Sequence, residues 1–582
     1  MKASYIVSAN IISALGFDSA GNAAQVSKGN SGIRRQEDVR LAPAPFHSSL
    51  IDDEKLNTHF AKISNPTEYT RLEKMLLLSL RDVIQSTNAD LGERTGLIIS
   101  TTKGNIDALS AASPFPPERA YLSALGSRIQ DFFGFANEPI VVSNACVSGI
   151  LAVAVAKRLT EAGVYDRVLV AGGDLVTPFV LSGFNSFQAV SPEPCRPFSA
   201  DRRGITIGEA AASVLVTTDR DLLTPQSVRI LGAATRNDAN HISGPSRTGE
   251  GLYRSIQSAL TESELTPADI DYISAHGTAT LYNDEMEAVA LNRVGLQTVP
   301  VNSLKGYYGH TLGASGLVET VIGLHALQEN RLYASAGYKE SGVSREINVI
   351  RAAENRPLDT FLKTASGFGG CNTAVVFTKI KDIAPARETP PDLSLVREDV
   401  CIIADGKVLL NDREVCRAET DDATFADFAK RIYKTLNPDY RKFFKMDNLS
   451  KLAFLAAECL FRSNEKLRNA DPDEVALILS NRAASLDTDR RHQNTIENPE
   501  NYFPSPAVFV YTLPNICLGE ISIRHGLQSE NAFFVFDRPR PEFLATYSRT
   551  LLQNGKAKYV ICGWADFDGE DYRAEMYVLS EK

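Results

Sequence analysis

One cysteine stands where a thiol could act as a nucleophile. Cys146 lies in Val-Val-Ser-Asn-Ala-Cys-Val-Ser-Gly (141–149), between a β-type apolar run at 139–142 and a helical run at 150–159. A thiol at such a strand-to-helix turn lies near the positive end of the helix, which favours the thiolate and surrounds it with backbone N–H groups. A free cysteine is more commonly a buried structural residue. Other segments of the chain must therefore decide between the two readings.

Two histidine segments could supply the hydrogen bonds and proton transfers that a thiol needs. His276 opens the loop His-Gly-Thr-Ala-Thr (276–280) after a short strand pattern, and His310 closes a Gly-rich turn that begins at Lys305. A single histidine is more often satisfied structurally by backbone carbonyls. Two histidines and a lysine, each at the end of a strand beside glycines, indicate a reactive site instead.

The elements that must position these residues repeat within the chain. The segments Ser-Gly-Ile-Leu (148–151) and Ser-Gly-Leu-Val (315–318) each open a small-residue, apolar helix. Such self-similarity predicts duplicated units related by a pseudo-twofold axis. We therefore expect the Cys146 turn and the His310 turn to face each other.

Five segments, in the order in which they stand along the chain, resemble those of the β-ketoacyl-acyl-carrier-protein synthases, the condensing enzymes of the thiolase superfamily. The resemblance covers about residues 1–380. The segments are the Cys146 turn, the His276 loop with Asn283, Asp284 and Glu287, the Lys305 to His310 turn with Glu319, the run 197–204 with 208–210, and the Gly-rich loop 367–370 with Asn372. Together they are far more specific than any one of them.

The resemblance implies a fold and a set of roles. The fold class is α/β, a thiolase-like duplicated α/β/α/β/α layered fold with halves at 1–225 and 226–380. The implied catalytic residues are Cys146, His276, His310 and Lys305. We expect Lys305 to fix His310 and to contact Glu319, which gives structural support.

The same resemblance implies substrate-binding residues. Thr278 and Thr280 are expected to hydrogen-bond the pantetheine arm, while Phe368 and Gly369 belong to a gating loop. The backbone N–H groups of Cys146 and Phe368 are expected to hold the tetrahedral oxyanion that forms during acyl transfer.

The implied reaction is a decarboxylative Claisen condensation. An acyl thioester and malonyl-acyl-carrier protein would give 3-oxoacyl-acyl-carrier protein, in fatty-acid or polyene/polyketide-type synthesis. No metal or dissociable cofactor is expected, since phosphopantetheine enters only as part of the carrier-protein substrate. A thiolase, the nearest alternative, usually has an asparagine in place of the first histidine and a second catalytic cysteine in the C-terminal loop. His276 and Phe368 stand at those places, and Cys371 falls three residues late.

The last third of the chain resembles a degenerate copy of the first half. Residues 381–400 carry three prolines and no helical period, which predicts a linker. Residues 401–582 then read as a degenerate α/β half-unit without catalytic residues. In the register we infer, 509–515 replaces 141–146, so Asn515 stands at the nucleophile position. The apolar run Ala507–Tyr511 predicts a strand buried on both faces.

Such an inert unit resembles the chain-length factors that accompany some polyketide-type synthases. The alternative function is therefore a non-catalytic, chain-length-factor-like scaffold for another synthase. Cys146 favours the enzyme, because inert partners of this kind have lost the nucleophile.

Composition is typical of a soluble cytoplasmic enzyme. The 582 residues are 43% hydrophobic and 23% charged, and the eight cysteines show no CxxC pairing. The chain has no uninterrupted apolar stretch of about 18 residues, so no membrane span is predicted. The net charge of −10 argues against a nucleic-acid partner. The expected partners are an acyl carrier protein and either a second copy of the chain or other synthase subunits.

Overall fold

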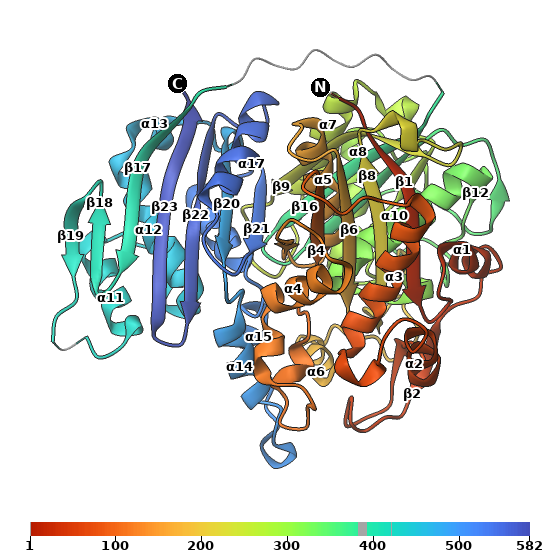
Figure 1. Ribbon diagram of the computed structural model, residues 1–582, viewed down its shortest axis with the longest axis horizontal. Coiled ribbons are helices and arrows are strands. Elements are labelled where there is room, and N and C mark those ends of the chain that lie inside the picture. Colours follow the sequence, from red (N-terminus) through yellow and green to blue (C-terminus); the bar gives the residue numbers. More distant parts are fainter. Residues whose placement is uncertain (1, 382–392, 421) are drawn as a thin grey trace.

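One large continuous sheet organises the computed structural model, which describes residues 2–381, 393–420 and 422–582 (Figure 1), and it divides into three parts that we call the first, second and third sheets. The first sheet has the order β5-β4-β6-β8-β1. Its strands are β1 (Ser4–Ser13), β4 (Thr95–Ser100), β5 (Ile140–Val142), β6 (Arg167–Asp174) and β8 (Ala210–Thr217). The parallel strands β4, β5 and β6 are almost wholly buried, as expected for strands covered on both faces.

The second sheet has the order β9-β16-β15-β10-β11-β13. Its strands are β9 (Val228–Asn237), β10 (Tyr272–Ser274), β11 (Pro300–Asn302), β13 (Asn348–Val349), β15 (Thr360–Gly367) and β16 (Cys371–Lys379). The first residues of β1 pair with β9 and join the two sheets.

Two helices, α5 (Ser148–Glu161) and α10 (Ser315–Glu329), lie between these sheets. They approach closely and reciprocally, because a Cβ on Gly149 would lie 2.8 Å from the Gly313 carbonyl oxygen and one on Gly316 would lie 2.7 Å from Ile150 N. Helix α3 (Arg71–Thr87) covers the outer face of the first sheet, and α7 (Glu250–Ser263) that of the second. The result is the five-layered, duplicated α/β arrangement predicted from the sequence.

The remaining helices of this body surround the layers. They are α1 (Ser19–Ser27), α2 (Asp53–Phe60), α4 (Leu122–Phe133), α6 (Pro178–Ser186), α8 (Leu281–Val294) and α9 (Lys305–Tyr308).

The C-terminal half-unit, residues 393–582, is built on the third sheet, of order β21-β20-β22-β23-β17-β18-β19. Its strands are β17 (Leu395–Ala404), β18 (Lys407–Leu410), β19 (Arg413–Arg417), β20 (Val475–Asn481), β21 (Asn531–Val535), β22 (Tyr559–Asp568) and β23 (Asp571–Glu581). Its helices are α11 (Phe425–Leu436), α12 (Asn448–Ser463), α13 (Glu465–Asn469), α14 (Leu486–Asn494), α15 (Pro506–Val510), α16 (Ile516–His525) and α17 (Pro541–Gln553).

This sheet repeats the topology of the first. Strand β20 pairs in parallel with β21 and β22, as β4 does with β5 and β6. Helix α12 covers β17, β23 and β22 as α3 covers β1, β8 and β6. The half-unit therefore has the strand order of the N-terminal half of the body.

The half-unit joins the body at a seam formed by β21 and β5. These strands pair antiparallel, with Phe534 opposite Val142 and Val535 opposite Val141, so the first and third sheets are continuous (Figure 1). Beside the seam, the buried Arg158 guanidinium of α5 donates a hydrogen bond of 2.6 Å to the Tyr547 hydroxyl of α17.

Two sequence predictions for the half-unit are wrong. Residues Ala507–Tyr511 are not a strand, because α15 begins at Pro506, the first helical position that proline favours. The inferred register is also wrong, because β21, and not 509–515, takes the place of β5. The turn equivalent to that of Cys146 therefore spans 536–540, where no cysteine stands.

The predicted linker is only partly described. Its residues 382–392 lie outside the described residues, while 395–400 already belong to β17 and so are strand. Among the helices of the described ranges, none has the length and apolar character needed to cross a bilayer.

Candidate active site

The Cys146 turn is held in a rare backbone conformation at the end of β5. Ala145 has φ of 48°, a left-handed value that costs a non-glycine residue roughly 1–3 kcal/mol. The Ser148 hydroxyl stabilises the turn, because it accepts from Asn144 N at 2.8 Å and donates to the Ala145 carbonyl at 2.6 Å. Helix α5 then begins at Ser148. This strand-to-helix turn is the one that the sequence predicts.

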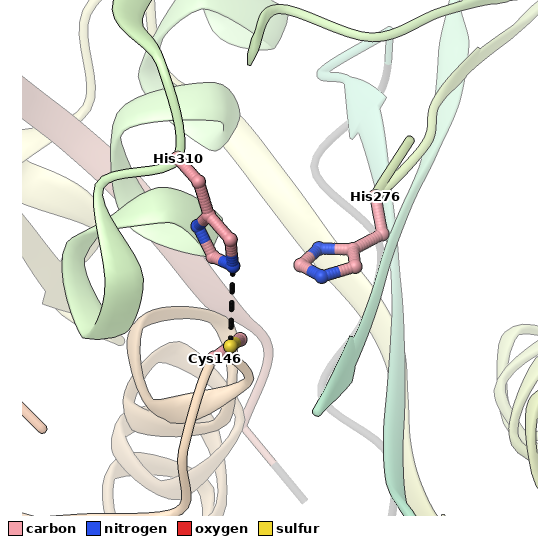
Figure 2. A group of neighbouring side chains, drawn as sticks. All are labelled: Cys146, His276 and His310. Carbon is pink, nitrogen blue, oxygen red and sulfur yellow. Dashed lines mark hydrogen bonds between the residues drawn. The ribbon is translucent and has the colours of Figure 1, made fainter. Parts of the chain in front are cut away.

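The two predicted histidines lie beside the thiol (Figure 2). His310 Nε2 lies 3.2 Å from Cys146 Sγ, and the rings of His276 and His310 meet edge to face with centroids 5.3 Å apart. Both histidines are 2% exposed. The expected meeting of the Cys146 and His310 turns is thus observed.

Hydrogen bonds fix the tautomer of both rings. The Leu312 backbone N–H donates to His310 Nδ1 at 3.1 Å, and the Lys305 ammonium lies 3.3 Å from His276 Nδ1. Each Nδ1 therefore accepts, which leaves the hydrogen on Nε2. Burial lowers the pKa of both histidines well below the ordinary value, so both are neutral hydrogen-bond donors at neutral pH.

Burial also acts on the thiol. Burial raises the pKa of Cys146 to about 12, and the Lys305 charge offsets only part of that effect. Desolvation of the sulfur thus opposes the thiolate that the nearby helix end favours. At neutral pH such a pKa favours the neutral thiol, beside two neutral Nε2–H imidazoles.

Lys305 contacts His276, and not His310 as expected. Its Nζ donates to the His276 carbonyl at 2.6 Å, lies 3.3 Å from His276 Nδ1, and pairs with Glu319 Oε1 at 2.7 Å. A second buried lysine, Lys363, binds Glu319 Oε2 at 2.8 Å and the Ser274 carbonyl at 3.0 Å. Sequence reasoning missed Lys363, which carries no motif beyond its place in strand β15.

The loop after His276 is held by Glu287 of α8. The Glu287 carboxylate accepts from the backbone N–H groups of His276 at 2.8 Å and of Gly277 at 2.6 Å. The hydroxyls of Thr278 and Thr280 lie 2.9 Å apart. Thr278 is almost buried and Thr280 is half-buried.

The Gly-rich loop lies against the Cys146 turn. A Cβ on Gly367 would lie 3.1 Å from Cys146 N. Gly369 and Gly370 have φ of 89° and 73°, which only glycine adopts readily. The Phe368 carbonyl accepts a hydrogen bond of 2.8 Å from Asn515 Nδ2 of the half-unit.

A cavity of about 40 Å³ adjoins the Cys146 thiol. The body contributes Thr102, Lys103, Ala145, Cys146, Val180, Phe184, Leu312 and Phe368 to its lining, and the half-unit contributes Phe509 and Leu513. Nearly all of its accessible lining is apolar. Lys103 contributes the aliphatic part of its side chain to this apolar lining, because its ammonium pairs with Asp489 of the half-unit at 2.9 Å.

Cys146, His276 and His310 are also the group of described residues that could hold a metal ion, since one donor atom of each lies within 4.8 Å of the others. A metal would need an unprotonated nitrogen from each ring and a thiolate. Both Nδ1 atoms already take part in hydrogen bonds, so a metal would have to displace the protons of the Nε2 atoms and of the thiol.

Two family models match the body of the chain. The model described as beta-ketoacyl synthase, N-terminal domain, matches residues 11–221, and the corresponding C-terminal domain model matches residues 228–339. The first match contains Cys146, and the second contains His276, Lys305 and His310.

Curated relatives resemble the same body. The chain is 30% identical over 282 residues to "Nodulation protein E" of Rhizobium leguminosarum bv. trifolii, covering 47% of this chain and 70% of that one. It is 34% identical over 255 residues to "3-oxoacyl-[acyl-carrier-protein] synthase 2" of Rhizobium meliloti, covering 41% and 60%.

Solved structures resemble both the body and the whole chain. A ketosynthase in complex with its chain length factor, from Xenorhabdus doucetiae, matches with a TM-score of 0.58 and 26% identity, over 65% of this chain and 98% of that one. A structure described as "PfaC Keto synthase-Chain length factor" covers 100% of this chain and 78% of its own, with a TM-score of 0.79 and 14% identity. The second likeness concerns the fold alone.

Proposed function

Because the chain belongs to the β-ketoacyl synthase family, we propose that it condenses an acyl thioester with malonyl-acyl-carrier protein. The products are 3-oxoacyl-acyl-carrier protein, carbon dioxide and the free thiol of the first carrier. One observation carries the proposal, namely that Cys146 Sγ lies 3.2 Å from His310 Nε2 in a site whose two imidazoles both present Nε2–H.

The first half-reaction loads the acyl group onto Cys146. The sulfur attacks the thioester carbonyl, the bond to the carrier sulfur breaks, and the proton of the Cys146 thiol ends on the departing pantetheine thiol. Since burial raises the pKa of the Cys146 thiol, its proton is lost as part of this step and not before it. The oxyanion would be held by the backbone N–H groups of Cys146 and Phe368.

The second half-reaction makes the carbon–carbon bond. The malonyl group loses carbon dioxide, and its electron pair forms an enolate whose oxygen accepts from the Nε2–H groups of His276 and His310. The enolate carbon then attacks the Cys146 thioester and releases the 3-oxoacyl product, and the departing Cys146 thiolate takes a proton from solvent to restore the thiol. Lys305 acts as a positioning residue, because its hydrogen bond to Nδ1 keeps the proton of His276 on Nε2.

The half-unit would act as a chain-length factor fused to the enzyme. Phe509 and Leu513 close the cavity beside Cys146 from the half-unit side. A cavity of about 40 Å³ holds little more than a water or two, so a long acyl chain requires these side chains or Phe368 to move. The non-catalytic scaffold, the alternative function, is disfavoured because Cys146 and both histidines are assembled.

The further assignments are part of the same proposal. Thr278 and Thr280 would bind the pantetheine arm of an acyl carrier protein, while Phe368 and Gly369 would open for the acyl chain. Association with a second copy of the chain or with other synthase subunits, and a cytoplasmic location, are also proposed. No metal or dissociable cofactor takes part.

A product assay tests the proposal. The protein is incubated with acyl- and malonyl-carrier thioesters, and 3-oxoacyl-carrier and carbon dioxide are measured. We expect both products from the wild type and neither condensation product nor acyl-enzyme from Cys146→Ala. Condensation at an unchanged rate by Cys146→Ala would overturn the proposal.

A further inference from the structure

We propose that Asn515 of the half-unit is a positioning residue for the oxyanion site at Cys146. Asn515 immediately precedes α16, is 1% exposed, and reaches across the seam to the Gly-rich loop of the body. Its Nδ2 donates to the Phe368 carbonyl at 2.8 Å. The thiol of Cys371, a weaker donor, shares that carbonyl at 3.3 Å.

The contact belongs to a close fit between α16 and the loop. A Cβ on Gly519 would lie 2.8 Å from the Gly369 carbonyl oxygen, and a Cβ on Gly369 would lie 2.5 Å from Asn515 Nδ2. Within the body, the loop is also held where Gly369 N donates to the Ile242 carbonyl at 2.6 Å and Asn237 Nδ2 donates to the Gly369 carbonyl at 2.9 Å. The Phe368 carbonyl and the Gly369 N–H belong to the same planar peptide unit, so the Ile242 bond holds that unit from the body and the Asn515 bond holds it from the half-unit.

The two ends of the Asn515 amide differ in their partners. Its Oδ1 is buried and has no hydrogen-bond partner among the described residues. Its Nδ2 bonds the Phe368 carbonyl, so the amide's hydrogen bond of 2.8 Å is directed at the Gly-rich loop.

The consequence for chemistry rests on the proposed function, in which Phe368 N–H is an oxyanion donor. Asn515 fixes the carbonyl on one side of the Phe368 Cα, and β15, which ends at Gly367, fixes the chain on the other side. The placement of the Phe368 N–H is therefore set by the chain on both sides of the residue. Losing the Asn515 bond removes the half-unit's hold on the peptide unit after Phe368 and leaves only the bonds from the body, and catalysis depends steeply on such placement.

Two reactions of Cys146 separate this role from a general structural one. Acyl transfer from an acyl-pantetheine thioester forms a tetrahedral oxyanion, whereas alkylation by iodoacetamide displaces iodide at carbon and needs no oxyanion site. Both rates are measured by intact mass in the full-length protein. The variants are Asn515→Ala, which removes the donor, and Asn515→Asp, which keeps the shape but places a carboxylate oxygen against the Phe368 carbonyl.

We expect acyl transfer to fall roughly tenfold to a hundredfold in both variants, less than the about 10²–10³ that removal of an oxyanion donor costs, because the Phe368 N–H is displaced and not removed. Alkylation should stay within about threefold, so the ratio of the two rates carries the signal. Asn464→Ala is the matched control. That buried asparagine bonds Glu398 and Asp399 within the half-unit, and both rates should remain those of the wild type.

Every other outcome counts against the inference. Wild-type acyl transfer in both Asn515 variants would overturn it, and so would a parallel fall of acyl transfer and alkylation, which would indicate general disruption of the site. A wild type that is alkylated but never acylated would overturn the proposed function itself, and the inference with it. Gly519→Ala, which pushes α16 from the Gly369 carbonyl, provides an independent variant with the same expected ratio.

Discussion

Two strand-to-helix turns of this molecule occupy equivalent places in their sheets but have different surroundings. Both connect a seam strand to a helix, β5 to α5 at 143–147 and β21 to α17 at 536–540. The first presents Cys146 to two buried histidines. The second presents Arg538, whose side chain is 72% exposed and pairs with Glu138 on the surface.

The difference shows that a strand-to-helix turn alone does not make an active site. Cys146 is faced by the His310 turn, which comes from the second half of the body, and the described half-unit has no corresponding second half. What the half-unit retains is α15 and α16, which approach the first turn from the other side of the seam. We therefore expect the half-unit to shape the Cys146 site and not to carry out chemistry of its own.

The largest effect is expected at Lys103 and Asp489, a buried ion pair that joins the body to the half-unit. Asp489→Ala leaves Lys103 buried without its counter-ion and should cost about 3–5 kcal/mol of unfolding free energy. The exposed Lys466–Glu398 pair within the half-unit is the control, and Lys466→Ala should cost at most about 1 kcal/mol. Urea unfolding measures both.

Lys103→Met combined with Asp489→Leu should recover most of that loss, because it removes both charges together. An unchanged unfolding midpoint in Asp489→Ala would show that the seam is not held by this pair.

The second-largest effect is expected at the two histidines of the body. His276→Ala or His310→Ala should slow malonyl decarboxylation roughly a hundredfold or more, since each removes a donor to the enolate oxygen. Acyl transfer to Cys146 should partly survive. His525→Ala, in the half-unit, should leave decarboxylation at the parent rate, and equal rates in all three variants would mean that the roles are misassigned.

The pH dependence of alkylation tests the state of the thiol. Because burial raises the pKa of Cys146 to about 12, the thiolate fraction grows about tenfold for each pH unit below that value. The rate of alkylation of Cys146 by iodoacetamide should therefore rise steadily from pH 7 to 10. A plateau near neutral pH would indicate a resting thiolate and contradict the neutral site.

The smallest effect concerns acyl preference. Phe509→Ala opens the cavity from the half-unit side and should favour longer acyl groups, near the lower end of the ~10- to 200-fold that one methylene in an apolar pocket can contribute. Phe444, 54% exposed on the half-unit, gives the control variant Phe444→Ala. Competition between acyl thioesters of different length measures the preference, and identical profiles would place the chain-length limit elsewhere.

The sequence alone located the body of the site because its residues lie in contiguous motifs. Cys146, His276 and His310 each stand in a recognisable turn, and the repeated Ser-Gly helices correctly brought two of these turns together. The contact of Lys305 with Glu319 was predicted correctly, but its histidine partner was mispredicted, since a lysine side chain can reach either histidine and only the packed structure shows which one it meets.

The half-unit was harder to read. An apolar run such as Ala507–Tyr511 fits a buried strand or a short buried helix equally well, and choosing the strand shifted the register away from β21. Asn515 and Lys363 carry no local signal, because their contacts join segments far apart in the chain. Asn515 was predicted to stand at the nucleophile position of the half-unit, which it does not occupy. Its observed contact is with the Phe368 carbonyl.

The central claim is that the acyl group is carried on Cys146 and on no other residue. Intact-mass analysis after incubation with a panel of acyl-pantetheine thioesters tests it most directly. We predict one acyl adduct on the wild type, the same adduct on Cys371→Ala and Cys517→Ala, and none on Cys146→Ala. An adduct that persists in Cys146→Ala, or that maps to the half-unit, would contradict the account.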